Sequence, residues 1–197
     1  MASKMKSTFL TMSLTLLIIA GVASSLLAYV YTLTKGPIEE ANKKKKIEAL
    51  SQVLPEFDNS PIDESFKVAS DGDSLIVYVG KKGDEIVGVA VETYTKEGFS
   101  GLFTVMAGFQ PDGTIYNTMI LQHLETPGLG DKMEKGKSDW SNQFSGKNPE
   151  TYKLKVKKDG GDVDAITAAT ISSRAYCDAI ERAYNAFMKE VKTKLAI

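Results

Sequence analysis

A long uncharged stretch opens the chain. Residues 8–34 carry no charged side chain and are mostly apolar. At about 1.5 Å per residue, a helix of this length spans a hydrocarbon core of about 30 Å with room for tilt. Tyr29 and Tyr31 lie near its end, where aromatic side chains anchor a helix at the membrane interface. The pattern predicts a transmembrane helix over residues 8–34, inserted in the lipid bilayer behind a short tail of residues 1–7.

A cleaved signal peptide is the alternative, because the small residues 23–25 are a passable cleavage context. The apolar core of a signal peptide usually has about 7–15 residues, so the longer stretch favours an uncleaved anchor. The flanking charges do not settle the orientation. Two lysines precede the stretch and five follow it (Lys4, Lys6; Lys35, Lys43, Lys44, Lys45, Lys46). That count favours a cytoplasmic domain, although long domains translocate largely regardless of charge.

The next segment, residues 35–70, is predicted as a juxtamembrane helix and a connection. Gly36-Pro37 is expected to break the membrane helix or to start the next one. Apolar residues then recur near helical spacing over residues 38–54, with the lysines on the solvated face. Pro55 is expected to end this helix, and residues 56–70 are predicted as a polar connection.

Residues 71–197 have a different pattern of apolar and polar residues and are predicted to form one domain. Four β-rich runs are separated by short turns, which indicates an antiparallel sheet: residues 74–79, 85–94, 101–108 and 114–121. Residues 152–156 are predicted as a further strand. The last element is an amphipathic helix from about Ser172 to Leu195, whose continuous apolar stripe we assign to the core. Helices before and after the strands indicate an α+β fold.

Composition excludes several classes of protein. The net charge of −1 gives no electrostatic basis for binding nucleic acid. The chain has one cysteine, Cys177, and one histidine, His123, so an internal disulfide or a metal site rich in these residues is excluded. Cys177 lies near the apolar stripe and is predicted to be a small buried hydrophobe.

Candidate chemistry lies directly before the last helix, in Asp164-Ala165-Ile166-Thr167-Ala168-Ala169-Thr170-Ile171-Ser172-Ser173. Small side chains let a ligand approach the backbone, and the first turn of a helix offers unpaired N–H groups to an anion. The alternative is that Thr170, Ser172 or Ser173 only caps the helix.

A second candidate is the loop His123-Leu124-Glu125-Thr126-Pro127-Gly128-Leu129-Gly130. Its Pro-Gly-Leu-Gly portion can turn sharply and expose main-chain groups to the edge of a flat heterocycle, with Leu129 packed on the face. A tight turn without a ligand is the alternative. His123 could serve as a general base, but it has no nucleophile in a recognisable motif. Dinucleotide-binding and ATP-binding glycine motifs are absent from the sequence.

Together the two motifs, in this order, resemble the FMN-binding domain family. That family includes the G subunits of Rnf-type electron-transport complexes and the C subunits of sodium-translocating NADH:quinone reductases, and the compact length is more similar to the former. Residues 167–173 match its Ser/Thr-Gly-Ala-Thr-x-Ser/Thr pattern, with Ala168 in place of the usual glycine. Residues 98–101, the Asp112-Gly113 turn, and Trp140 with Phe144 extend the resemblance over nearly the whole chain.

The resemblance implies that Thr170 carries FMN through a phosphoester bond that a separate flavin transferase makes. The helix start would stabilise the phosphate, and Lys153 or Lys155 could neutralise it. The residues expected around the cofactor are Glu125, Thr126, Gly128, Leu129, Gly130, Thr167, Ala168, Ala169, Ser172 and Ser173.

The resemblance also implies the function. We expect an electron-transfer subunit, without independent catalysis, that works beside other subunits of an ion-translocating ferredoxin:NAD+ oxidoreductase in the inner membrane. Its FMN domain is expected on the extracytoplasmic face, against the lysine count, and the resemblance thus implies that the tail of residues 1–7 is cytoplasmic. Two alternatives stay open: a flavinylated donor to another extracytoplasmic reductase, and a membrane-anchored binding or sensor module without a cofactor.

Overall fold

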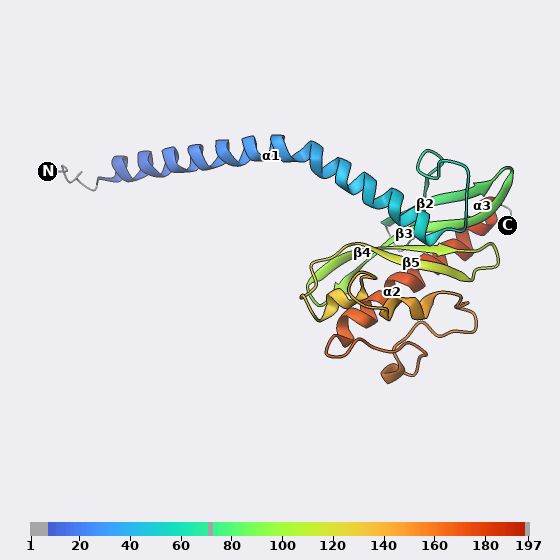
Figure 1. Cartoon of the computed structure of the whole chain (residues 1–197). Helices are drawn as coiled ribbons and strands as arrows, with labels where there is room; N and C mark the ends of the chain where they lie inside the picture. Colours follow the sequence, from blue (N-terminus) through green and yellow to red (C-terminus); the bar gives the residue numbers. More distant parts are fainter. Residues whose placement is uncertain (1–7, 71–72, 196–197) are drawn as a thin grey trace. The chain divides into compact units, whose positions relative to one another are not determined.

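The computed structural model describes residues 8–70 and 73–195, so the predicted tail of residues 1–7 lies outside the described part. The main elements are α1 (Phe9–Val53), β1 (Phe66–Ser70), β2 (Asp73–Lys82), β3 (Glu85–Gly98), β4 (Gly101–Phe109), β5 (Ile115–Gln122), α2 (Thr170–Ala186) and α3 (Lys192–Leu195) (Figure 1). Three short 3-10 helices and one π-helical turn complete them: η1 (Gly130–Met133), η2 (Trp140–Phe144), η3 (Lys157–Asp159) and η4 (Phe187–Val191). The α+β prediction is confirmed.

Helix α1 is continuous over 45 residues and is long and apolar enough in its N-terminal part to cross a bilayer. The chain forms two compact units, one up to Lys44 and one from Lys45, and α1 contributes to both. The expected break at Gly36-Pro37 is wrong, because Pro37 lies inside the helix. A proline removes one main-chain hydrogen bond, and the helix continues on both sides of that loss.

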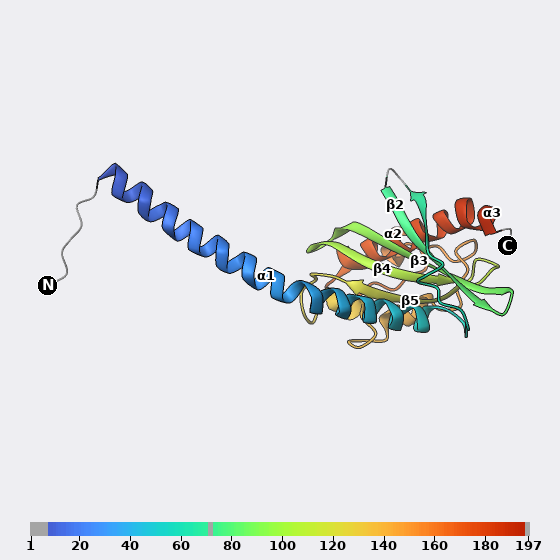
Figure 2. The ribbon, with the colours of Figure 1, turned by 90° about the horizontal axis from the view of Figure 1, so that it is seen from above.

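The second unit contains a five-stranded antiparallel sheet in the order β1-β2-β3-β4-β5 (Figure 2). Four of these strands were predicted, and the hairpin between β2 and β3 is confirmed. Strand β1 was missed, because it lies within the segment predicted as a polar connection. It pairs with β2 from Phe66 opposite Val77 to Ser70 opposite Asp73 and forms one edge of the sheet.

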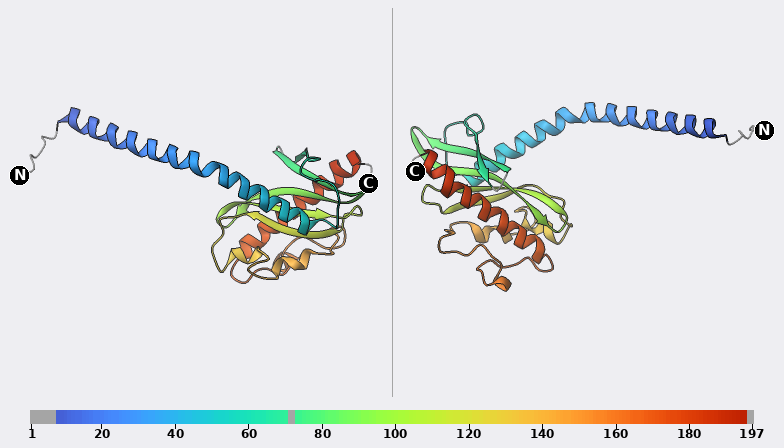
Figure 3. Two further views of the ribbon diagram at one scale, coloured as in Figure 1. Left: turned by 45° about the horizontal axis from the view of Figure 1, so that its top comes forward. Right: turned by 180° about the vertical axis from the view of Figure 1, so that it is seen from behind.

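Both faces of the sheet are covered. Helix α2 lies across one face, and the C-terminal end of α1 lies across the other (Figure 3). Alternate residues of β4 face opposite sides, as a pleated strand requires. Val105 and Ala107 belong to the core under α2, whereas Met106 packs with Leu50 and Val53 of α1. This second core is fitted closely, since a Cβ on Gly108 would lie 1.7 Å from the carbonyl oxygen of Val53.

The C-terminal region differs from the prediction in one element. Residues 152–156 form no strand, and the only ladder contact described there is an isolated parallel bridge between Val156 and Val163. The main chain of this segment bonds locally, with Asp162 N–H donating to Lys153 O and Val163 N–H donating to Lys155 O. The predicted last helix is present as α2, η4 and α3. Its apolar stripe is core, as predicted, and Cys177 is buried.

Candidate functional site

A cavity of about 300 Å³ opens beside the first turn of α2. Three segments that are distant in the sequence form its walls: the turn between β3 and β4, the loop after β5, and the start of α2. The lining residues are Phe99, Glu125, Thr126, Leu129, Gly130, Ala168, Ala169, Thr170, Ile171 and Ser172. The two motifs singled out in the sequence therefore meet in one hollow. Its volume lies at the lower end of the range for small-molecule sites.

Most residues expected around a cofactor line this cavity, and the exceptions are Gly128, Thr167 and Ser173. Two lining residues were not predicted as contacts, Phe99 and Ile171. Both are large apolar residues that stay exposed to solvent. For Phe99, the signal available in the sequence was an aromatic residue between Gly98 and Gly101. For Ile171, the signal was only its position next to Thr170.

The start of α2 lacks a side-chain cap. The helix begins at Thr170, and Ala169 at the N-cap makes no side-chain cap hydrogen bond. The side chain of Ser173 accepts from Ile166 N–H at 2.9 Å and donates to Ala169 O at 3.0 Å, so it fastens the preceding turn. The alternative, that Thr170, Ser172 or Ser173 only caps the helix, is therefore not what the described residues show. The first-turn N–H groups remain available to an anion in the cavity.

The turn before α2 has an unusual backbone. Ala168 has a φ of +63°, the left-handed conformation, and among the described residues it is the one non-glycine with positive φ. A residue with a Cβ is strained there by the order of 1 kcal/mol. The sequence departs from the family pattern at this position, where glycine is usual. The conformation accounts for that preference and brings half-buried Thr170 to the cavity wall.

Glu125 is the one charged residue among the described residues that line the cavity, and its exposed fraction is 5%. Ser172 Oγ donates to its Oε2 at 2.7 Å, and Ser100 N–H donates to its Oε1 at 3.1 Å. The carboxylate comes from the loop after β5, and each of the other two walls of the cavity contributes one partner to it. Bonds to a carboxylate are stronger than neutral ones and orient the side chain.

His123 fixes the loop that carries Glu125. Its Nδ1 accepts from Glu125 N–H at 3.0 Å, so a neutral ring carries its proton on Nε2 and donates to Glu134 Oε1, also at 3.0 Å. The tautomer is assigned from these contacts. With both nitrogens engaged and no hydroxyl among the partners of the ring, His123 has a structural role here and not that of a general base.

Neither Lys153 nor Lys155 lines the cavity. Both lie along a different cleft of about 470 Å³ that borders the C-terminal part of α2. Within residues 8–70 and 73–195, the cavity wall contains no lysine or arginine. The expectation that one of these lysines neutralises a phosphate is therefore not supported. The feature of the cavity wall that favours an anion is the start of α2.

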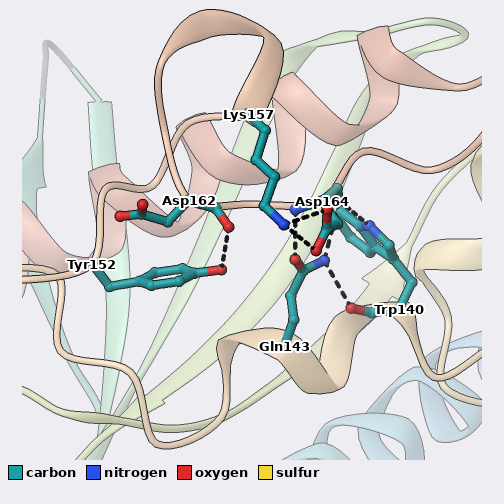
Figure 4. A network of polar contacts seen from close by, with 6 residues as sticks. All are labelled: Trp140, Gln143, Tyr152, Lys157, Asp162 and Asp164. Carbon is teal, nitrogen blue, oxygen red and sulfur yellow. Dashed lines mark hydrogen bonds and ion pairs between the residues drawn. The ribbon is translucent and has the colours of Figure 1, made fainter.

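A polar network holds the segment that leads into the turn (Figure 4). The Gln143 amide accepts from Asp164 N–H at 2.8 Å and donates to Asp164 O at 3.3 Å. Trp140 Nε1–H donates to the same carbonyl at 2.5 Å, and Lys157 pairs with the Asp164 side chain at 2.7 Å. Sequence reasoning missed Gln143, because an amide that bonds to main chain leaves no motif.

The aromatic and thiol groups beneath this network are core. The Trp140 ring meets the rings of Phe144 and Tyr176 edge to face, at centroid distances of 5.4 and 5.1 Å. Burial raises the pKa of the Cys177 thiol to about 12, and the exposed fraction of this residue is 3%. Cys177 therefore stays a neutral, unreactive thiol at physiological pH.

The fold and the cavity can be compared with known proteins. Residues 98–185 match the FMN-binding domain, and residues 5–53 match the RnfG N-terminal region. The FMN-binding match begins at the turn that carries Phe99 and ends in α2, so it contains every wall of the cavity. The class of protein is therefore an FMN-binding protein with an N-terminal apolar helix.

Similar proteins show which family within this class the chain belongs to. The chain is 38% identical to the G subunit of the ion-translocating oxidoreductase complex of Erwinia tasmaniensis, over 85% of this chain and 84% of the relative. It is 37% identical to the protein of the same name from Cereibacter sphaeroides, over 92% and 85%, and 34% identical to that of Vibrio atlanticus, over 86% of each. The chain belongs to the family of ion-translocating oxidoreductase complex G subunits.

The described residues fit FMN on physical grounds. Phe99, Leu129 and Ile171 supply apolar surface to a flat ring system, and the uncapped start of α2 supplies N–H groups to a phosphate. Thr170 lines the cavity and is the first residue of α2. Glycine at position 130 leaves room for the Glu125 and Ser172 side chains in the cavity wall, since a Cβ there would lie 2.4 Å from Glu125 Oε2 and 2.8 Å from Ser172 Oγ.

Proposed function

We propose that this chain is a single-pass membrane subunit that carries FMN on Thr170 through a phosphoester bond. It relays electrons within an ion-translocating ferredoxin:NAD+ oxidoreductase complex, in contact with other subunits of that complex. The observation that carries the proposal is the meeting of the 125–130 loop with the uncapped start of α2 in one cavity, which Thr170 lines. Family membership and the apolar helix α1 support the complex and the membrane location.

Each part of the cavity has a defined task in this proposal. Thr170 Oγ1 forms the bond to phosphorus while the phosphoanhydride bond of an activated flavin nucleotide breaks. The departing phosphate group accepts the hydroxyl proton, in a step that a flavin transferase catalyses. The N–H groups of the first turn of α2 bind the phosphate oxygens. Phe99, Leu129 and Ile171 exclude water from the ring. Bound FMN supplies the redox chemistry, and the protein holds and tunes it.

The attachment site is tested by a pair of variants coexpressed with the flavin transferase. Thr170→Val removes the hydroxyl and keeps the shape, so covalent flavin should disappear while the domain stays folded. Fluorescence of the band on a denaturing gel measures it. Thr167→Val is the matched control and should keep the flavin, because Thr167 is exposed and lies outside the cavity wall. A fully fluorescent Thr170→Val band would refute the proposal.

We also propose that the FMN domain lies on the extracytoplasmic face, where a covalent bond prevents loss of the cofactor. Lys158 is exposed on this domain, and Cys177 is buried with a pKa raised to about 12 by burial, so the single native thiol gives a low labelling background. A membrane-impermeant maleimide should label Lys158→Cys in intact spheroplasts and leave the unsubstituted chain unlabelled. Labelling that requires lysis would place the domain in the cytoplasm.

A further inference from the structure

We propose that Glu125 is a positioning residue for the covalent attachment of the flavin. Its carboxylate holds the first turn of α2 against the turn between β3 and β4, and this bridge sets the position from which Thr170 reaches the cavity. The inference rests on the proposed function, since it concerns the same site. It differs from the sequence-based expectation that Glu125 and Ser172 both act by touching the cofactor.

The bridge consists of two hydrogen bonds to opposite oxygens of one carboxylate. Ser172 Oγ donates to Oε2 at 2.7 Å, and Ser100 N–H donates to Oε1 at 3.1 Å. The first partner belongs to α2 and the second to the β3–β4 turn, which are 72 residues apart in the chain. With both bonds made, the three walls of the cavity are joined through a side chain that is 5% exposed.

Two glycines pack closely against the carboxylate. A Cβ on Gly98 would lie 2.8 Å from Glu125 Oε1, and a Cβ on Gly130 would lie 2.4 Å from Oε2. Two of the neighbouring backbone segments thus approach as closely as glycine allows. Movement of the carboxylate would leave a buried charged group without its partners, which is costly.

The bridge also changes the role of Ser172. A serine hydroxyl has one hydrogen to donate, and that hydrogen is given to Glu125. Ser172 and Thr170 lie in the same turn of α2, so the bond that holds Ser172 also restrains Thr170. Main-chain N–H groups then bind the flavin phosphate, while the hydrogen bond between Glu125 and Ser172 holds the first turn of α2 in position.

Three variants of the full chain, coexpressed with the flavin transferase, separate positioning from direct contact. Ser172→Ala removes the donor to Oε2, and Glu125→Ala removes the whole bridge. Glu125→Gln removes the charge but keeps an oxygen for Ser100 N–H and a polar group opposite Ser172 Oγ. The rate of flavin incorporation, followed by gel fluorescence per amount of protein after induction, should fall about tenfold in Ser172→Ala and more in Glu125→Ala. Glu125→Gln should stay within about threefold of the unsubstituted chain.

Ser141→Ala is the matched control for Ser172→Ala. Ser141 is 1% exposed, and its hydroxyl has no hydrogen-bond partner among residues 8–70 and 73–195. The same atom is removed from an equally buried site, so this variant should incorporate flavin at the unsubstituted rate.

Each contrary result overturns the positioning role in its own way. Equal loss of flavin in Glu125→Gln and Glu125→Ala would mean that the charge acts directly on the cofactor. Normal incorporation in Ser172→Ala would mean that the bridge is not needed, and a similar loss in Ser141→Ala would assign the effect to general destabilisation. The proposed function fails separately, through retention of covalent flavin in Thr170→Val.

Discussion

Two hollows border the same helix, and only one of them has the chemistry of a cofactor site. The cavity at the start of α2 measures about 300 Å³ and has apolar walls around one buried carboxylate. The cleft along the C-terminal part of α2 is larger, about 470 Å³. Its lining includes several charged side chains that are exposed: Lys153, Lys155, Asp159 and Glu181.

The difference concerns the property of a surface that favours binding of a phosphate. Exposed lysines are solvated and interact weakly with a distant anion. Unpaired main-chain N–H groups at a helix start are fixed in direction and need no side-chain ordering. In the cleft, Asp159 and Glu181 balance the formal charges of Lys153 and Lys155. Backbone geometry instead favours the smaller cavity.

The largest effect on the cavity is expected from a side chain added at Gly130. Gly130→Ala puts a Cβ 2.4 Å from Glu125 Oε2 and 2.9 Å from Glu125 Cβ, so the carboxylate must move away from Ser172. Covalent flavin per chain should fall by about tenfold or more, as measured by gel fluorescence, because a charged hydrogen bond is lost and the cavity narrows. Gly136→Ala is the control, since nothing lies within 4 Å of a Cβ there. Full flavin in Gly130→Ala would show that the cavity is more plastic than the glycine contacts indicate.

A smaller effect, on stability, is expected outside the cavity, at the polar network that holds Asp164. Gln143→Leu removes both amide bonds to the Asp164 main chain. The free energy of unfolding should fall by about 2 kcal/mol, and the Tm of the full chain by about 4–8 °C, in thermal unfolding followed by circular dichroism.

The neighbouring Asn142→Leu is the control for that substitution, because its amide bonds only to an exposed Asp139 side chain at 3.2 Å. Its Tm should change by less than about 2 °C, as for most surface substitutions. Equal losses in the two variants would mean that the Asp164 contacts contribute no more than a surface hydrogen bond.

The smallest effect is expected in the charged cleft. The double variant Lys153→Gln with Lys155→Gln removes the two lysines that a charge-based interpretation would pair with the phosphate. Covalent flavin should stay within about twofold of the unsubstituted chain, because neither lysine lines the cavity. A large loss in this double variant would mean that the cleft, and not the cavity alone, takes part in flavin attachment or in binding the transferase.

The sequence predicts most of the fold where periodicity is strong. The apolar N-terminal stretch, four of the strands and the last helix follow from local pattern. Strand β1 was missed because five residues within a polar segment carry little pattern, and its pairing with β2 is what fixes it. The break expected at Pro37 did not occur, since the helix tolerates the loss of one hydrogen bond within a long run of others.

The two motifs that line the cavity could be predicted from the sequence, but the hydrogen bond that joins them could not. Both motifs were visible in the sequence, and the resemblance brought them together. The bond between Ser172 and Glu125 links residues 47 positions apart, and nothing local indicates that two polar residues will bond to each other instead of to a ligand. Lys153 and Lys155 show the converse, because proximity in sequence to the turn before α2 did not bring them to the cavity wall.

The most direct test of the account is to locate the flavin on the chain. Full-length protein, coexpressed with its flavin transferase and extracted from membranes, is digested with trypsin. The fragment of residues 159–174 contains Thr167, Thr170, Ser172 and Ser173, so tandem mass spectrometry can distinguish the four hydroxyls. The account predicts one FMN phosphoester, on Thr170. The same modification on Thr167, Ser172 or Ser173, or an unmodified fragment from fully processed protein, would contradict it.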